Sequence, residues 1–232
     1  MSRISVIIPA AGQSRRFRGA ATKKTFFSLH GKPVWAHAVE PFRQRSDVVQ
    51  IIIVVAPNDL ADFSIEFAEL IEAWKLTVVP GGSERSVSVA NGFRAVSPDC
   101  DLVAIHDAAR PCVDPELIQR VIQAAATTGA AIPGVPINST LKRIDQGNRI
   151  IATVDRDGLF QAQTPQVFRR SVYDQMLASA GGLQSTDDAQ LAETLGIPVT
   201  MVAGSISNIK ITEREDIEFA QVYLSRRLSI DT

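Results

Sequence analysis

The chain has 232 residues, of which 45% are hydrophobic and 21% charged, and its formal net charge is -1. This is an ordinary globular composition, and it excludes a strong overall field that would attract nucleic acid. No apolar run approaches the roughly 20 residues that span a bilayer, so we expect neither nucleic acid nor a membrane as a partner. Cys100 and Cys112 have neither a metal-site nor a redox spacing, and the N-terminus has no signal-peptide pattern. Reduced thiols and a cytoplasmic location are therefore predicted.

Short β-branched runs alternate with segments of helical periodicity along most of the chain. The predicted strands cover residues 4–8, 48–55, 77–79, 102–105, 130–135 and 199–202. The predicted helices cover residues 33–44, 58–74, 86–96, 115–127, 170–179, 187–195 and 212–228. Such alternation indicates an α/β, Rossmann-like fold with a mostly parallel twisted sheet and helices on both faces. In such a sheet, ligands bind beyond the carboxyl ends of the strands.

One segment interrupts this rhythm. Residues 140–144 and 149–154 flank the turn signal Asp145-Gln146-Gly147-Asn148, which predicts a β-hairpin arm at about 138–156. A lone hairpin is marginally stable, so we expect it to pack against a second copy of the chain or, alternatively, against its own domain. The sequence shows no internal repeat or linker. We therefore expect one domain over residues 1–232 that carries this arm.

The first strand ends in a loop of small residues followed by clustered positive charge. The small residues are Ala10, Ala11 and Gly12, and the cations that follow include Arg16, Lys23 and Lys24. Small side chains let backbone N–H groups approach phosphate oxygens, which the cations neutralise, so this pattern predicts a triphosphate site. The loop has neither the Gly-Lys-Ser/Thr ending of a Walker loop nor the second glycine of a dinucleotide fingerprint. The alternative is a basic surface turn that is solvated by water.

Polar residues also follow the strand at 102–105. Asp107 and Arg110 come directly after it, and they suit a metal ion and an anionic substrate respectively. The alternative is a structural Asp–Arg pair that closes the loop. In a third segment, Gly81 and Gly82 lie between a strand and a helix with Ser88 one turn further on. These groups suit recognition of a base edge, or the glycines merely permit a tight turn.

Together these segments resemble the 2-C-methyl-D-erythritol 4-phosphate cytidylyltransferases of isoprenoid precursor synthesis. The stretch His-Asp-Ala-Ala-Arg-Pro at 106–111 is the most specific, and further segments extend the resemblance over nearly the whole chain. They are 153–156, 163–166, 185–188 and 208–212. The resemblance implies a nucleotidyltransferase that converts CTP and methylerythritol 4-phosphate into the CDP-alcohol and pyrophosphate. It also implies Mg²⁺ as cofactor and a homodimer formed through the arm.

The resemblance also assigns roles to individual residues. It makes Arg16 and Lys24 the groups that stabilise the pentacoordinate transition state, and it makes Arg156 and Lys210 the groups that position the nucleophile. The residues expected to line the cytidine and phosphate pocket are Ala10, Ala11, Gly12, Gly82 and Ser88. The residues expected to hold the sugar phosphate are Asp107, Arg156, Thr164, Thr186 and Lys210. Thr140, Arg110 and Arg156 are expected to complete a neighbour's site.

Three points stay open within the resemblance. Asp107 is also expected to contact Mg²⁺, either directly or through water. Lys23 stands where the family often has proline before its lysine, and the segment from Arg16 to Lys24 is one residue longer than the family's pattern. We therefore favour Lys24 over Lys23 as the catalytic lysine without excluding Lys23.

The acceptor's own chemistry explains why a histidine-poor chain without a nucleophile triad could be an enzyme. A phosphate monoester has a second pKa of about 6, so it attacks as a dianion and needs no general base. The nearest rival is a cytidylyltransferase for another polyol phosphate, such as ribitol 5-phosphate. The sequence also leaves room for a non-catalytic nucleotide-binding module and for a glycosyltransferase.

Overall fold

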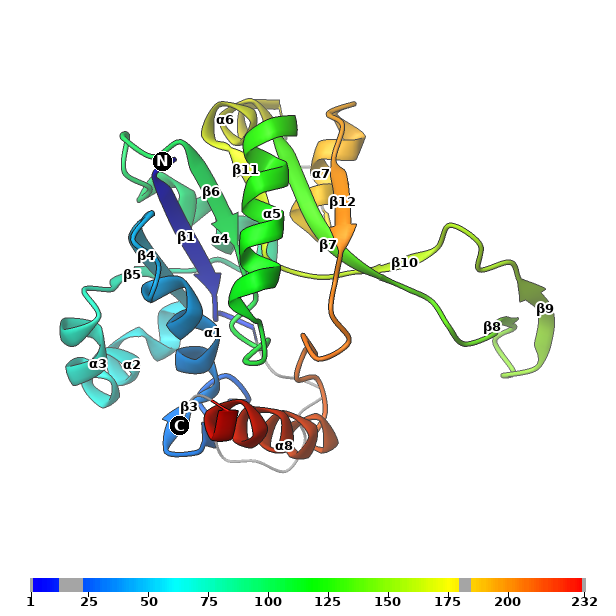
Figure 1. The fold of residues 1–232 in the computed structure, drawn as a ribbon, viewed down its shortest axis with the longest axis horizontal. Coiled ribbons are helices and arrows are strands. Elements are labelled where there is room, and N and C mark those ends of the chain that lie inside the picture. Colours follow the sequence, from blue (N-terminus) through cyan, green and yellow to red (C-terminus); the bar gives the residue numbers. More distant parts are fainter. Residues whose placement is uncertain (1, 13–22, 180–184, 231–232) are drawn as a thin grey trace.

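The computed structural model describes residues 2–12, 23–179 and 185–230 of the chain. A twisted sheet lies between layers of helices, and a long hairpin projects from one side (Figure 1). This arrangement confirms the predicted α/β fold with helices on both faces and a projecting arm. No helix in the described ranges combines the length and apolar character needed to cross a bilayer.

Within the described residues, the central sheet has eight strands. One half is parallel: β1 (Ile4–Pro9) pairs with β4 (Val48–Val55) and β6 (Leu102–Ile105), and β4 pairs with β5 (Thr77–Pro80). In the other half, β7 pairs in parallel with β12 and antiparallel with β10 and β11, and β11 joins β7 to β6. The bounds of these strands are β7 Ala130–Pro136, β10 Phe160–Ala162, β11 Gln166–Arg169 and β12 Thr200–Ala203.

The helices cover both faces because successive strand residues point in opposite directions. Val6 and Ile8 of β1 belong to one buried cluster, whereas Ile7 belongs to another. The first cluster is covered by α1 (Val34–Arg43), α2 (Leu60–Glu66), α3 (Ala68–Ala73) and α5 (Pro115–Thr128). The second is covered by α4 (Arg85–Arg94), α6 (Arg170–Ser179) and α7 (Asp188–Thr194). A third cluster joins Leu29 of β2 (Ser28–Leu29) and Cys112 to Ile217 and Leu224 of α8 (Glu215–Ile230). Strand β2 pairs with β3 (Lys32–Pro33).

Two features differ from the sequence prediction. The single helix expected over 58–74 is a 3₁₀ turn, η1 (Pro57–Asp59), followed by α2 and α3, which meet at Phe67. Phe67 leaves helical geometry while its ring packs 5.4 Å from Trp35 and 5.0 Å from Phe63, so tertiary aromatic packing overrides the local periodicity. In addition, β10 and β11 were not predicted. They introduce the antiparallel part of the sheet.

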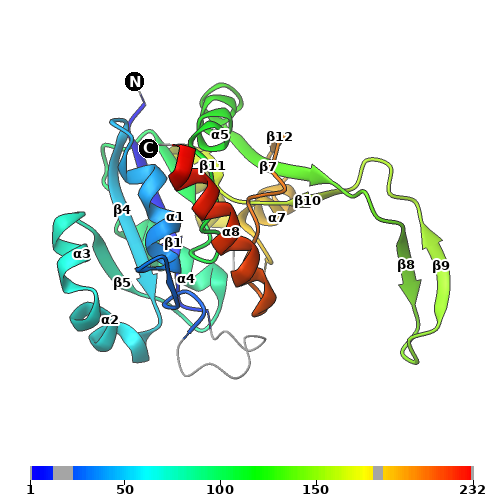
Figure 2. The ribbon, with the colours of Figure 1, turned by 60° about the horizontal axis from the view of Figure 1, so that its bottom comes forward.

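The arm consists of β8 (Leu141–Ile144) and β9 (Ile150–Val154), which pair only with each other among the described strands. It extends away from the sheet in both ribbon views (Figure 2). Ile150 and Ile151 of β9 are 66% and 62% exposed. The alternative that the arm folds back onto its own domain is therefore wrong.

Candidate active site

A cavity of about 490 Å³ lies beyond the carboxyl ends of β1, β4, β5 and β6, where the sequence predicted a ligand site. Its wall contains many of the predicted residues. These are Ala10, Ala11, Gly12, Lys24, Gly82, Ser88, Asp107 and Lys210. The cavity also includes Thr25, Asn58, Glu84 and Arg85, which the sequence analysis did not single out.

The loops after β1 and β5 touch each other at the cavity wall. The Ala10 N–H donates to the Val54 carbonyl at 2.8 Å, so Ala10 continues the β1–β4 ladder and only the following residues turn away. A Cβ on Gly81 would lie 2.8 Å from Cβ of Ala11, closer than real Cβ contacts allow. A Cβ on Gly12 would meet nothing within 4 Å. Glycine is therefore required at 81 for close packing, whereas Gly12 borders open space.

Ser88 shapes the loop before α4. Its hydroxyl donates to the Glu84 carbonyl at 2.9 Å and accepts from the Gly82 N–H at 3.0 Å, and the residue is 2% exposed. Both of these bonds hold Gly82 beside the first turn of α4. The N-terminus of α4 borders the cavity, and its partial positive charge favours an anion there.

The structure separates the two neighbouring lysines. Lys24 lines the cavity and its Nζ donates to the Ile211 carbonyl at 2.8 Å, whereas Lys23 forms an ion pair with Asp59 of η1. This placement supports Lys24 over Lys23 as the lysine that serves the cavity. Arg16 belongs to residues 13–22, outside the described part of the chain.

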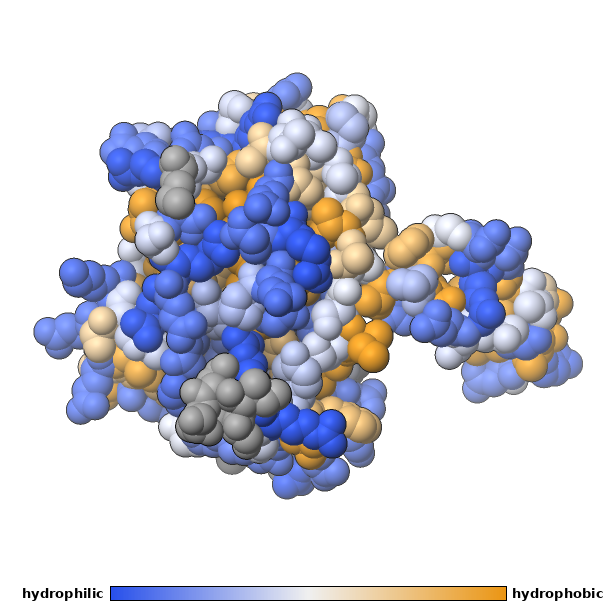
Figure 3. Space-filling view, in the orientation of Figure 1, coloured by the Kyte–Doolittle hydropathy of each residue, from blue (hydrophilic) through white to orange (hydrophobic). Residues whose placement is uncertain are grey.

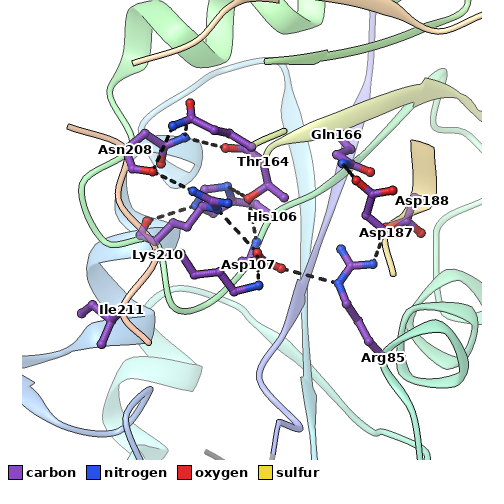
Figure 4. Close-up of polar contacts among 12 residues, drawn as sticks. Arg85, His106, Asp107, Thr164, Gln166, Asp187, Asp188, Asn208, Lys210 and Ile211 are labelled. Carbon is purple, nitrogen blue, oxygen red and sulfur yellow. Dashed lines mark hydrogen bonds and ion pairs between the residues drawn. The ribbon is translucent and has the colours of Figure 1, made fainter. Parts of the chain in front are cut away.

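Asp107 stands at the centre of a cluster of positive charge (Figure 4). Its Oδ2 lies 2.8 Å from Nζ of Lys210 and 3.5 Å from Nε of Arg110, and its Oδ1 lies 3.6 Å from Nε of Arg85. Burial alone would raise the pKa of Asp107, but Lys210, Arg85 and Arg110 hold it well below its usual range. The carboxylate is therefore ionised, and it fixes three cations beside the cavity.

Arg85 links this cluster to α7. Its Nη1 lies 2.7 Å from Oδ2 of Asp188, and the Tyr173 hydroxyl donates to Oδ1 of the same carboxylate at 2.7 Å. Burial would lower the pKa of Arg85, but Asp188 and Asp107 raise it, so the guanidinium stays charged. Asp107 and Asp188 together carry two negative charges against the three positive charges of Arg85, Arg110 and Lys210. The cluster keeps a surplus positive charge that suits a phosphorylated ligand.

Comparison with known proteins identifies the family. The model of the 2-C-methyl-D-erythritol 4-phosphate cytidylyltransferases matches residues 4–226. The chain belongs to this family. It is 42% identical to the 2-C-methyl-D-erythritol 4-phosphate cytidylyltransferase of Rhodopirellula baltica over 96% of this chain and 95% of that protein. It is also similar to the crystal structure of the enzyme of that name from Thermus thermophilus, with 33% identity, a TM-score of 0.80, and coverage of 97% and 99% of the two chains.

The remaining residues expected from the cytidylyltransferase family lie away from the cavity wall. The Thr186 hydroxyl donates to Oε1 of Gln190 at the start of α7, at 3.1 Å. Thr140 directly precedes β8 and Arg156 follows β9, and Arg156 donates to the Asn138 carbonyl. Arg110 forms an ion pair with Asp107, and its Nη1 donates to the Asn208 carbonyl at 2.8 Å. Thr164 is 4% exposed and bonds to residues beside the cavity.

Direct coordination of Mg²⁺ by Asp107 does not fit these surroundings. Both carboxylate oxygens face cationic side chains, which a metal ion would have to displace. Within residues 2–12, 23–179 and 185–230, no group of three or more His, Cys, Asp or Glu residues is arranged to hold a metal. The side chains around Asp107 present positive charge, which favours an anionic ligand.

Proposed function

We propose that this chain transfers CMP from CTP to 2-C-methyl-D-erythritol 4-phosphate and releases pyrophosphate, in the non-mevalonate route to isoprenoid precursors. Family membership supports this activity. The observation that carries it is the meeting of Lys24 and Lys210 at one cavity. They are far apart in the sequence, and Lys24 is held there by the carbonyl of Ile211, the residue after Lys210.

The cavity supplies what this reaction demands. An oxygen of the acceptor phosphate attacks the α-phosphorus of CTP, a new P–O bond forms, and the bond to the pyrophosphate oxygen breaks. The acceptor is mostly a dianion at neutral pH, so no proton has to be removed. Catalysis then consists of bringing two polyanions together and stabilising the charge that moves onto the leaving group.

The two lysines have different roles in this scheme. Lys24, with Arg16, stabilises charge on the attacked α-phosphate. Lys210 is held by Asp107 at 2.8 Å, and it positions the acceptor phosphate. The N-terminus of α4, the loop at Gly82 and Ser88 line the cavity. We infer that they border the nucleotide and that their wall fits a pyrimidine better than a purine.

We propose that the arm acts in a homodimer. Thr140 and Arg156 then complete the acceptor site of the neighbouring chain. Support comes from the arm's projection and from the exposure of Ile150 and Ile151, apolar side chains that a second copy would cover. Figure 3 shows apolar side chains, in orange, among the polar ones of the arm.

The proposal also covers the source of Mg²⁺ and the cellular compartment of the protein. Since Asp107 does not suit direct coordination, the Mg²⁺ arrives bound to the triphosphate of CTP as part of the substrate. Cys100 and Cys112 are buried free thiols, which supports a reducing compartment such as the cytoplasm.

The activity is tested by incubating the protein with CTP, Mg²⁺ and methylerythritol 4-phosphate, and by measuring pyrophosphate release and the mass of the nucleotide product. We expect the CDP-alcohol. Ribitol 5-phosphate replaces the acceptor in a parallel reaction, and ATP replaces CTP in another. Faster turnover with ribitol 5-phosphate would favour the rival polyol substrate. Equal turnover with ATP would contradict the pyrimidine pocket, and no pyrophosphate release with either acceptor would refute the proposed function.

A further inference from the structure

His106, the residue between β6 and Asp107, is a fully buried histidine that the proposed reaction does not use. Its ring centroid lies 5.2 Å from that of Phe42. Both ring nitrogens have partners: Nε2 lies 3.2 Å from the Arg110 carbonyl oxygen, and Nδ1 lies 3.0 Å from Oγ1 of Thr164. The partners determine where the ring carries its hydrogen.

The directions of these hydrogen bonds follow from the chemistry of each group. A carbonyl oxygen only accepts, so Nε2 of His106 carries the hydrogen that faces Arg110. Burial lowers the pKa of His106 to about 4, so the ring is neutral at pH 7 and Nδ1 has a lone pair. The Thr164 hydroxyl therefore donates to Nδ1. Its oxygen accepts from the Asp107 N–H at 3.1 Å.

This network fixes the backbone of Asp107 on both sides. The Asp107 N–H is held by Thr164, and the Asp107 carbonyl accepts from the Arg110 N–H at 3.0 Å. The Thr164 carbonyl in turn accepts from Nδ2 of Asn208 at 2.8 Å, two residues before Lys210. Thr164 thus contacts both segments that supply the pair Asp107–Lys210 (Figure 4).

We propose that His106 and Thr164 are positioning residues of the acceptor site. In its Nε2–H tautomer, His106 accepts the hydroxyl hydrogen of Thr164 at Nδ1. The hydroxyl oxygen, oriented in this way, accepts from the Asp107 N–H and fixes the position of Asp107. The Asp107 carboxylate in turn holds Nζ of Lys210. This role rests on the proposed function. Because the hydroxyl proton is committed to His106, any contact of this hydroxyl with the sugar phosphate would be as an acceptor only.

The tautomer is tested on the wild-type protein without any assay of activity. Histidine labelled with ¹⁵N distinguishes the Nε2–H ring, the Nδ1–H ring and the charged ring by the shifts of the two nitrogens. The chain has three histidines, so loss of one set of signals in His106→Asn assigns them. We expect the Nε2–H form at pH 7.5. An Nδ1–H ring or a charged ring would overturn the proposal.

The functional role is tested with a matched pair of variants, Thr164→Val and Thr164→Ser. Valine keeps the shape and removes the hydroxyl, whereas serine keeps the hydroxyl. We expect Thr164→Val to lower kcat/KM for methylerythritol 4-phosphate about tenfold, to leave KM for CTP within about twofold, and to shift the His106 Nδ1 signal. Thr164→Ser should restore both the signal and the kinetic constants.

The other possible results of these experiments separate the positioning role from the proposed function. Wild-type kinetics in Thr164→Val would overturn the positioning role, as would a loss of activity in Thr164→Ser equal to that in Thr164→Val. If Thr164→Val does not fold, Thr164→Ser and the wild-type spectrum still test the positioning role. A Thr164→Ser variant that has full activity but an altered His106 tautomer would contradict that role. Absence of CMP transfer by the wild-type protein would refute the proposed function, and the spectrum would still test the network.

Discussion

The cavity and the arm differ in how many of their charged and apolar groups find partners within the same chain. At the cavity, the Asp107 carboxylate is buried and meets Lys210, Arg85 and Arg110 within the same chain. On the arm, β8 and β9 pair only with each other among the described strands, and Ile150 is 66% exposed. A two-stranded hairpin is marginal alone. The comparison indicates that the charges of the cavity are preorganised in one chain, whereas the arm leaves apolar side chains exposed that the proposed homodimer would cover.

The largest effect is expected at the two cavity lysines. Lys24→Ala and Lys210→Ala should each lower kcat about 10²-fold or more, as loss of one preorganised donor typically does. The same loss is expected for Arg16→Ala. The control is Lys32→Ala, because Lys32 forms a partly exposed ion pair with Glu40 outside the cavity. Steady-state kinetics with pyrophosphate detection checks the effect, and near-normal turnover in both lysine variants would refute their roles.

The next effect is a dependence of stability on pH that His106 contributes. The ring stays neutral in the folded protein down to about pH 4, whereas it takes up a proton near pH 6.5 when unfolded. The unfolded state thus binds more protons between these values, and the free energy of unfolding should fall by about 3 kcal/mol as the pH is lowered through this interval. Asp107 adds a loss only in more acidic solution, below its ordinary pKa.

Urea unfolding between pH 4 and pH 7 measures this dependence. His106→Asn should show a shallower slope than the wild type over the same interval. Some slope should remain in that variant, because burial also lowers the pKa of His37. Equal slopes in the two proteins would contradict the buried, neutral state of His106.

A smaller effect is expected on the arm. Arg156→Ala should raise KM for methylerythritol 4-phosphate about tenfold and leave KM for CTP unchanged, since it removes one charged hydrogen-bonding group from the acceptor side only. Arg149→Ala is the matched control, because Arg149 lies on the same arm with a side chain that is 86% exposed and pairs with Asp145. A selective loss of CTP binding in Arg156→Ala would count against this placement.

The smallest effect is expected from the apolar surface of the arm. Ile150→Ser should change the free energy of unfolding of the single chain by no more than about 0.5 kcal/mol, because the side chain is exposed there. It should nevertheless weaken self-association about threefold to tenfold. Sedimentation over a range of concentrations measures this, with Ile65→Ser, 78% exposed on α2, as the control. Equal association of both variants would show that the arm does not form the interface.

The fold could be predicted from the sequence where the signal is local. The strands at 48–55 and 102–105 and the helix at 115–127 lie where periodicity places them, because hydrophobic runs and an N-cap at Asp114 mark their ends. Strands β10 and β11 have only three and four residues, and their pairing is set by β6 and β7. Unlike the continuous apolar run at 102–105, Phe-Gln-Ala and Gln-Val-Phe-Arg are short and mixed in polarity, so the local pattern does not distinguish these strands from loops.

In the site too, the features with a local sequence signal could be predicted, whereas those set by long-range contacts could not. The loop after β1 and the segment at Asp107 are contiguous in the sequence, so their residue types alone indicated an anion site. Arg85 was missed because its partner Asp188 is 103 positions away, and nothing next to it marks a buried ion pair. The position of Thr164 beside Asp107, 57 positions apart, also depends on the folded sheet.

The central claim is that each active site combines the cavity of one chain with the arm of the other. It is tested most directly by mixing two defective chains, with the concentration of methylerythritol 4-phosphate kept well below its KM. Lys210→Ala damages the cavity and keeps the arm, whereas Arg156→Ala damages the arm and keeps the cavity. After the two are unfolded together and refolded, half of the dimers should pair one of each, and each such dimer should contain one intact site, so activity should return to about a quarter of the wild-type value. Activity no higher than the mean of the two separate variants would contradict the account.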